Sequence, residues 1–263
     1  MYNYTIGVDI GSSSSKAVLL KDGKEIVDSL VIQTGIGSNG SHALLEKFLD
    51  KVNLKKEDIK KIIVTGYGRF TFEGANNQIS EISCHAKGIH FLVNDARTII
   101  DIGGQDAKAI ALNDKGRVQQ FFMNDKCAAG TGRFLTVMAN ILEVPLDKLG
   151  YYDSLATSPV SVSSTCTVFA ETEVISQLST GASIENVVAG IHNSVAQKVG
   201  GLAKKTALKD TIVLCGGGAK NPGILRALEE NLKRKIVVAP NPQTTGALGA
   251  AIYAYEEFIK GEE

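Results

Sequence analysis

Short apolar runs and amphipathic stretches alternate along most of the chain. Runs of strand length precede two Asp-Ile-Gly triplets and recur at residues 25–32, 61–65, 117–123, 211–214 and 235–239. Helical spacing of apolar positions predicts helices over residues 42–52, 78–92, 132–143, 168–178, 184–208, 224–232 and 246–259. Strands that alternate with helices in this way indicate the α/β class.

The most informative feature is an internal repeat. Residues 6–27 read IGVDIGSSSSKAVLLKDGKEIV, and residues 98–118 read TIIDIGGQDAKAIALNDKGRV. Asp9 matches Asp101, and the same offset places Lys16 on Lys108. Each copy predicts a strand, a Gly/Ser-rich turn, a second strand, a turn and a third strand. We therefore expect two similar halves, residues 1–95 and 96–243, with a C-terminal helix in 244–263 packing back on the first.

The turns after the two Asp-Ile-Gly triplets suit phosphate binding. A tight turn after a buried strand exposes backbone N–H groups, and serine hydroxyls add further donors. Asp9 and Asp101 end their strands where they could bind Mg²⁺ that carries a phosphate. Either turn alone could be a plain hairpin, but two at equivalent points favour a nucleotide site, and neither matches the P-loop or dinucleotide-binding pattern. The residues expected to bind phosphate are Gly11, Ser12, Ser13, Ser14, Ser15, Lys16, Gly103 and Gly104.

A third glycine-rich turn, CGGGAKN at residues 215–221, follows a strand. Three glycines allow a flat ring or a phosphate to approach the backbone. The expected binding residues here are Gly216, Gly217, Gly218 and Lys220. In contrast, GALGAA at residues 246–251 indicates close helix packing. Lys16 could bind a phosphate, but its repeat mate Lys108 equally favours a salt bridge on the second strand.

Together, residues 9–16, 101–106 and 216–218 and the helices near 78–92 and 246–259 resemble the actin-like ATPase superfamily, which includes sugar kinases and heat-shock chaperone ATPases. The resemblance implies two ribonuclease-H-like halves with a nucleotide cleft between them. Glu81 is the candidate, by position on the first connecting helix, to orient water; a solvated helix face is the alternative. We expect Gln105, Asp106 or both to position the attacking water or a water on the metal.

Composition narrows the class of protein. The chain has 263 residues with 28 basic and 28 acidic side chains, so its net charge is zero. A zero balance argues against a general nucleic-acid or membrane-surface binder. No apolar run has the ~20 residues that a membrane span needs, and the N-terminus reads as a strand, so we expect a cytoplasmic protein.

Four cysteines, Cys84, Cys127, Cys166 and Cys215, are far apart and include no CxxC pair, so a disulfide framework is not expected. Cys127 and Cys166 lie among small and helix-capping residues, which predicts positions near helix N-termini, where anions such as thiolates are stabilised. Two thiols are too few for a zinc site or a cubane cluster, but a symmetric dimer would supply four. Buried structural cysteines are the alternative, and this is our interpretation of Cys84 and Cys215.

The segments NDKCAAGTGRF and SSTCTVFAETEVISQLS closely resemble the activator ATPases of 2-hydroxyacyl-CoA dehydratases, sometimes called archerases, whose group also contains ATPase subunits of benzoyl-CoA reductases. The segments GYGR, QISEISCHAKG, AGIHNSVA and GALGAAIYAY match as well, so the resemblance covers essentially the whole chain. It implies a homodimer with one [4Fe–4S] cluster bridged by Cys127 and Cys166 of each copy, and ATP or ADP with Mg²⁺ in each chain.

The same resemblance implies a function. A ferredoxin or flavodoxin would reduce the cluster, and ATP hydrolysis would drive one electron to a cysteine-rich iron–sulfur partner. That partner is a 2-hydroxyacyl-CoA dehydratase, a benzoyl-CoA reductase or a double-cubane cluster protein, and the sequence leaves the acyl group and the electron donor open. Two rivals stay open: a small-molecule kinase, for which the chain is short, and a nucleotide-gated binding protein without iron.

Overall fold

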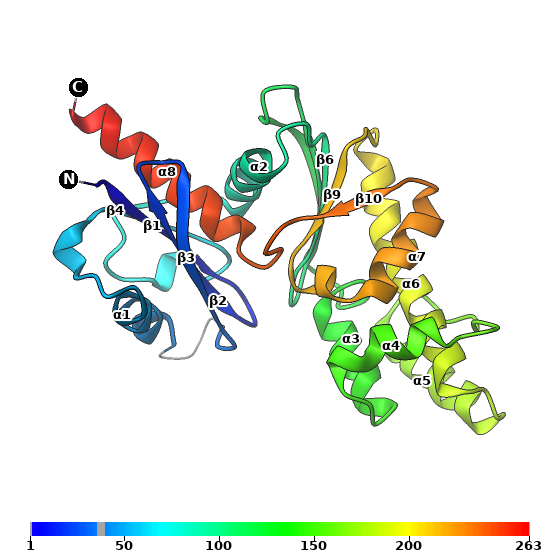
Figure 1. Ribbon diagram of the computed structural model, residues 1–263. Coiled ribbons are helices and arrows are strands. Elements are labelled where there is room, and N and C mark those ends of the chain that lie inside the picture. Colours follow the sequence, from blue (N-terminus) through cyan, green and yellow to red (C-terminus); the bar gives the residue numbers. More distant parts are fainter. Residues whose placement is uncertain (1, 36–39, 263) are drawn as a thin grey trace. The chain divides into compact units, whose positions relative to one another are not determined.

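The computed structural model describes residues 2–35 and 40–262. The chain divides into two compact units (Figure 1). The first comprises Met1–Ala96, Leu112–Gln119 and Ala239–Glu263, and the second comprises Arg97–Ala111 and Gln120–Val238. Each unit contains one five-stranded sheet with helices packed on it, which confirms the α/β class.

The first sheet has the strand order β3-β2-β1-β4-β5. Strands β1 (Tyr4–Ile10), β2 (Ser15–Lys21) and β3 (Glu25–Ile32) form an antiparallel meander, and β4 (Ile59–Thr65) and β5 (Asn77–Gln78) add on in parallel. Six of the seven β1 residues are buried, because helices cover the central strand. The register places Asp9 between Lys16 on β2 and Thr65 on β4.

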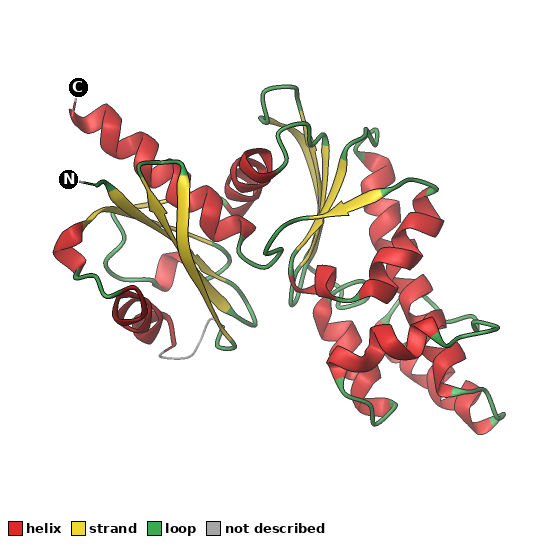
Figure 2. Ribbon diagram, viewed as in Figure 1, coloured by secondary structure: helices red, strands yellow, loops and turns green. Residues whose placement is uncertain are grey.

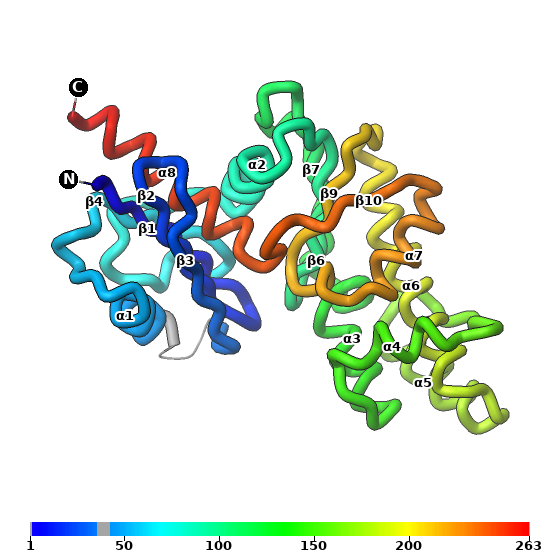
Figure 3. Tube along the Cα trace, in the orientation of Figure 1, coloured from blue at the N-terminus to red at the C-terminus, as the bar shows by residue number. Residues whose placement is uncertain are grey.

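The second sheet repeats this order as β8-β7-β6-β9-β10 and can be followed in Figure 3. Its strands are β6 (Thr98–Ile102), β7 (Ala107–Leu112), β8 (Val118–Asn124), β9 (Ile212–Cys215) and β10 (Ile236–Val238). Here the register places Asp101 between Lys108 on β7 and Cys215 on β9. The duplicated meander seen in the sequence is thus part of two sheets with one topology.

The described residues of the first unit include the α-helices α1 (Gly40–Val52), α2 (Glu81–Leu92) and α8 (Thr245–Glu262). Small residues let α8 approach closely, because a Cβ atom at Gly7 would collide with the α8 backbone and one at Gly249 with the Cys84 carbonyl on α2. The close helix packing expected at residues 246–251 is therefore confirmed. Ser80 caps α2 through a bond from the Ser83 N–H, so the helix predicted from residue 78 begins three residues later.

Five α-helices lie among the described residues of the second unit: α3 (Gly132–Ile141), α4 (Leu149–Ser154), α5 (Thr167–Ser179), α6 (Ile184–Lys205) and α7 (Pro222–Leu232). Figure 2 shows α6 and α7 packed side by side in this unit. The predicted apolar stripe of α6 is buried at Val187, Val188, Ile191, Val195 and Val199. The short helix α4 was not predicted. In the described part of the chain, no helix is both long and apolar enough to cross a membrane.

Candidate functional site

An aspartate and a lysine face each other across neighbouring strands in both sheets. In the first, Lys16 Nζ lies 3.2 Å from Asp9 Oδ2. In the second, Lys108 Nζ lies 3.1 Å from Asp101 Oδ2 and 2.7 Å from Asp106 Oδ2. Both lysines therefore form the salt bridge that was one of the two interpretations of Lys16. Lys108 is the more enclosed, because its side chain is 2% exposed and that of Lys16 is 14% exposed.

The two glycine-rich turns are closed by equivalent backbone hydrogen bonds. The Gly11 N–H donates to the Ser14 carbonyl at 3.1 Å, and the Gly103 N–H donates to the Asp106 carbonyl at 2.9 Å. In the first turn, the Ser15 hydroxyl donates to the Thr34 carbonyl at 2.7 Å, so it has a partner within the protein. Of the expected residues, Ser13 and Gln105 are exposed at the turns, Ser12, Gly103 and Gly104 are partly exposed, and Ser14 is buried.

The internal repeat extends further than sequence comparison revealed. Gly66 follows β4 with φ +90°, and Gly216 follows β9 with φ +84°, a conformation that side chains disfavour. A Cβ atom at Gly66 would collide with Asp9 Oδ1 and the Ile10 carbonyl, and one at Gly216 with Asp101 Oδ1 and the Ile102 carbonyl. Each aspartate thus lies against a glycine of the neighbouring strand end. The sequence signal was Gly-x-Gly after the strand in both halves, at residues 66–68 and 216–218.

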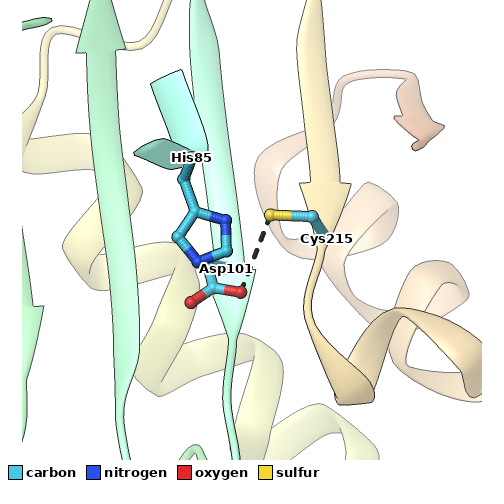
Figure 4. A group of neighbouring side chains, drawn as sticks. All are labelled: His85, Asp101 and Cys215. Carbon is cyan, nitrogen blue, oxygen red and sulfur yellow. Dashed lines mark hydrogen bonds between the residues drawn. The ribbon is translucent and has the colours of Figure 1, made fainter. Parts of the chain in front are cut away.

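The turn after β9 is a short 3₁₀ helix, Gly217–Lys220, that leads into α7. Its glycines give it an exposed surface at Gly217, and Lys220 is exposed at its end. Cys215 precedes this turn, and its thiol donates to Asp101 Oδ1 at 3.6 Å (Figure 4). Cys215 is fully buried, as expected of a structural cysteine, but it also contacts the carboxylate that we assigned to magnesium.

Sequence reasoning missed a buried histidine in the first unit. Glu81 is the first residue of α2, where its negative charge complements the helix dipole. One turn later, His85 Nδ1 lies 2.9 Å from the Thr245 hydroxyl. A Cβ atom at Gly246 would lie 3.3 Å from His85 Nε2 and 3.4 Å from Asp9 Oδ2, so the histidine is close to the aspartate end of β1. Nothing in the sequence marked His85 as part of a site, because apolar and polar residues are mixed along its helix.

The cysteines Cys127 and Cys166 come together in the second unit. The Cys127 thiol donates to the carbonyl of Thr165 at 3.8 Å, directly before Cys166, and both cysteines are free and partly exposed. Cys166 is the N-cap of α5, so it lies at a helix N-terminus as expected. Cys127 was expected near a helix N-terminus, and it lies in the loop that leads to Thr131, the N-cap of α3.

Cys84 differs from this pair. Burial raises the pKa of its thiol to about 12, and it is fully buried inside α2. A thiol in this state is neutral at physiological pH and a poor ligand. Cys84 therefore has the structural role that we expected.

The Cys127 loop is connected to the second glycine-rich turn. The N–H groups of Gly132 and Arg133 at the start of α3 donate to the carbonyls of Gly103 and Gly104 at 2.9 and 2.7 Å. Upstream, the Asn124 amide donates to the Cys127 carbonyl at 2.8 Å and to the Ala129 carbonyl at 3.0 Å. A continuous set of hydrogen bonds and short chain segments thus runs from the turn to the cysteine loop.

The chain is similar to known proteins over nearly its whole length. The model of the BadF/BadG/BcrA/BcrD ATPase family matches residues 6–254. The chain belongs to that family. It is 62% identical over 253 residues to an activator of lactoyl-CoA dehydratase from Anaerotignum propionicum, a match that covers 96% of this chain and 98% of the relative.

Among solved structures, an activator of the 2-hydroxyisocaproyl-CoA dehydratase from Clostridium difficile with bound ADPNP superposes with a TM-score of 0.95. It is 53% identical, and the match covers 98% of this chain and 97% of that one. A ROK family glucokinase from Streptomyces griseus, in complex with glucose and AMPPNP, has a TM-score of 0.55 at 14% identity and covers 97% and 100% of the two chains. That likeness shows the actin-like ATPase fold alone. The family and fold expected from the sequence are both confirmed.

Proposed function

We propose that this protein is an activator ATPase of a 2-hydroxyacyl-CoA dehydratase and delivers single electrons to it at the expense of ATP. Full-length similarity to such activators supports this function. The observation that carries it is the contact of the Cys127 loop with Thr165, directly before Cys166, in the unit whose glycine-rich turn is bonded to α3. A kinase has no need for this arrangement, and a nucleotide-gated binding protein would not need two adjacent free thiols.

The nucleotide is bound by the glycine-rich turns. Backbone N–H groups and hydroxyls at residues 12–14 and the N–H group of Gly104 bind phosphate oxygens, while the N–H groups of Gly11 and Gly103 close the two turns. Asp9 and Asp101 bind Mg²⁺ directly or through water, and Lys16, which has one carboxylate partner, turns toward phosphate when the metal occupies Asp9. Gln105 positions the attacking water, because it is exposed at the turn and Asp106 is paired with Lys108. The turn Gly216–Lys220 receives the adenosine.

The donor set fits an iron–sulfur cluster shared by two copies of the chain. Cys127 and Cys166 are free, partly exposed and close in space, and two copies supply the four thiolates that a [4Fe–4S] cluster requires. Such a cluster supplies one-electron chemistry when bound. Cys166 begins α5, so the helix N-terminus directs its partial positive charge toward negative charge at this position. Exposed Val168 and Phe169 on the first turn of α5 add apolar surface beside the thiol.

Nucleotide state reaches the cysteines through α3. The carbonyls of Gly103 and Gly104 are fixed to the first turn of α3, so a change in the turn on hydrolysis moves the segment that carries Cys127. Small displacements are sufficient to change the reduction potential of the cluster, since a shift of 59 mV in a one-electron potential corresponds to only about 1.4 kcal/mol. A ferredoxin or flavodoxin is the electron source, and the homodimer, Mg²⁺ and cytoplasmic location belong to the same proposal.

The test is ATP-dependent activation of a dehydratase. The oxygen-free protein, ATP, Mg²⁺ and a one-electron reductant are mixed with lactoyl-CoA dehydratase from Anaerotignum propionicum, and dehydration of lactoyl-CoA is followed. Activation should require hydrolysable ATP and should be lost in Cys127→Ala but kept in Cys84→Ala. ATP turnover without activation, together with wild-type behaviour of Cys127→Ala, would favour a kinase or a nucleotide-gated binding protein.

A further inference from the structure

A buried polar network lies behind the Gly216–Lys220 turn and has no part in the function described so far. At its centre is His192, in the middle of α6 and 0% exposed. Its Nδ1 lies 2.8 Å from Asp153 Oδ1 on α4, and its Nε2 lies 2.9 Å from the amide nitrogen of Asn221. Since burial of unpaired polar groups is costly, a histidine with both ring nitrogens bonded is held in one orientation.

The partners of Asn221 determine which ring nitrogen carries the proton. Asn221 Oδ1 accepts from the Gly223 N–H at 2.9 Å, so its amide nitrogen faces His192 and donates. His192 Nε2 must then accept, which places the imidazole proton on Nδ1, where it is donated to Asp153. His192 thus donates from Nδ1 and accepts at Nε2, and its ring is oriented from both sides.

Asp153 is in turn fixed from α7. Arg226 donates to both carboxylate oxygens, from Nε at 2.7 Å and from Nη2 at 2.9 Å. Burial raises the pKa of Asp153, but hydrogen bonds from His192 and Arg226 outweigh it and hold the pKa at about 2. The carboxylate therefore stays charged and keeps accepting from His192 at physiological pH.

Asn221 connects this network to the turn. Its N–H donates to the Gly218 carbonyl at 3.1 Å, which closes the turn, and its side chain caps α7. There is little room for adjustment, because a Cβ atom at Gly223 would collide with the His192 ring. Any rotation of the Asn221 side chain would release both the cap of α7 and the bond to His192.

We propose that His192 is a positioning residue for nucleotide binding: through Asn221 it holds the Gly216–Lys220 turn in the conformation that receives adenosine. This inference rests on the proposed function, which assigns adenosine to that turn. His192 does not contact the nucleotide itself. Its contribution is to fix the end of the turn before the ligand arrives, which reduces the cost of ordering it on binding.

Two substitutions of His192 test the hydrogen bonds of its two ring nitrogens separately. His192→Gln keeps an acceptor at the position of Nε2, toward Asn221, whereas His192→Asn keeps a donor at the position of Nδ1, toward Asp153. Asn221→Asp keeps the cap of α7 but cannot donate to His192, and it tests the same bond if His192→Asn folds poorly. Val195→Ala, a buried change one turn along α6, controls for loss of stability.

The dissociation constant for Mg-ADP is measured by titration calorimetry on the intact protein, together with the KM and kcat of ATP hydrolysis. His192→Asn and Asn221→Asp should weaken ADP binding about tenfold and raise the KM for ATP by the same factor, which corresponds to the loss of one hydrogen bond. The kcat should stay within about twofold of wild type. His192→Gln and Val195→Ala should stay close to wild type.

Equal affinities in His192→Asn and wild type, or an equal loss in Val195→Ala, would overturn this inference and leave the proposed function intact. A wild-type protein that binds no ADP would overturn both.

Discussion

The two glycine-rich turns have the same backbone and different surroundings. Both follow an aspartate on a central strand and are closed by the same backbone bond. The first turn is bonded, through Ser15, to the segment after β3, and its Lys16 pairs with the carboxylate of Asp9. The second is bonded to α3, and its Lys108 lies between two carboxylates.

This difference indicates that the two turns, although similar in sequence, have different roles. A lysine with one partner and a partly exposed side chain can exchange that partner for phosphate. A lysine enclosed by Asp101 and Asp106 instead holds both carboxylates, and the second turn is also bonded to the start of α3, which leads back to the Cys127 loop. In the proposed function, the first turn would therefore hold the nucleotide, and the second would also transmit its state.

The largest expected effect comes from Lys108→Met. Removing the cation breaks its salt bridges to Asp101, which is buried, and to Asp106, which is partly buried, and we expect a loss of about 3 kcal/mol in the free energy of unfolding. Lys16→Met should cost about 1 kcal/mol but weaken ATP binding roughly tenfold. Urea denaturation and nucleotide titration measure the two quantities. Similar stability losses in the two variants would mean that Lys16 and Lys108 have equivalent structural roles.

A second experiment tests what the two halves still share. Gly66→Ala and Gly216→Ala should each lose about 2–3 kcal/mol of stability, because the added methyl group meets an aspartate oxygen and the backbone is left-handed. Gly181→Ala is the matched control, since Gly181 also has φ +90° but nothing lies within 4 Å of its Cβ position. It should lose only about 1 kcal/mol. If all three variants melt alike, the close approach to Asp9 and Asp101 is unimportant.

Acid titration probes the network that supports the second half. The pKa of Asp153 is lowered from 3.8 to about 2 in the folded protein, so its stabilising effect is present above the unfolded value and is lost as pH falls through the folded one. Asp153→Asn should cost about 2 kcal/mol near neutral pH and should flatten the fall in stability between about pH 4 and pH 2. Chemical denaturation across that range is the measurement. A variant curve parallel to wild type would exclude Asp153 as the titrating group.

The smallest structural change tests the route from turn to cysteine. A methyl group at Gly132 would lie 3.1 Å from the Gly103 carbonyl oxygen, so Gly132→Ala displaces the turn by a few tenths of an ångström with little loss of stability. In cluster-free wild type, AMPPNP should change the alkylation rate of Cys127; in Gly132→Ala that response should fall several-fold. Gly201→Ala, on α6 with nothing within 4 Å, is the control. An undiminished response in Gly132→Ala would rule out this route.

Much of the fold was predictable from the sequence because it is encoded locally. Strand β3 matches its predicted bounds, and α6 begins at the predicted residue and buries the predicted stripe. Helix α4 was missed, since its six residues are too short for periodicity and are fixed by packing on α6 and α7.

The site was less predictable, because it depends on residues far apart in the chain. The partnership of Gly66 with Asp9, the Cys215–Asp101 bond and the His192 network depend on strand register and helix packing. Cys127 was expected only near a helix start, and its exact place in the loop before α3 was not predictable, because small residues favour loops as well as helix ends. Of these contacts, the Gly66–Asp9 partnership left a signal in the sequence, the Gly-x-Gly at residues 66–68 and 216–218.

The most direct test of the account is the iron and acid-labile sulfide content per chain of protein purified strictly without oxygen. A cluster shared by two copies predicts about two of each per chain in wild type and Cys84→Ala, and almost none in Cys127→Ala or Cys166→Ala. Wild-type protein that binds ATP but holds no iron, even after reconstitution with iron and sulfide, would contradict the account.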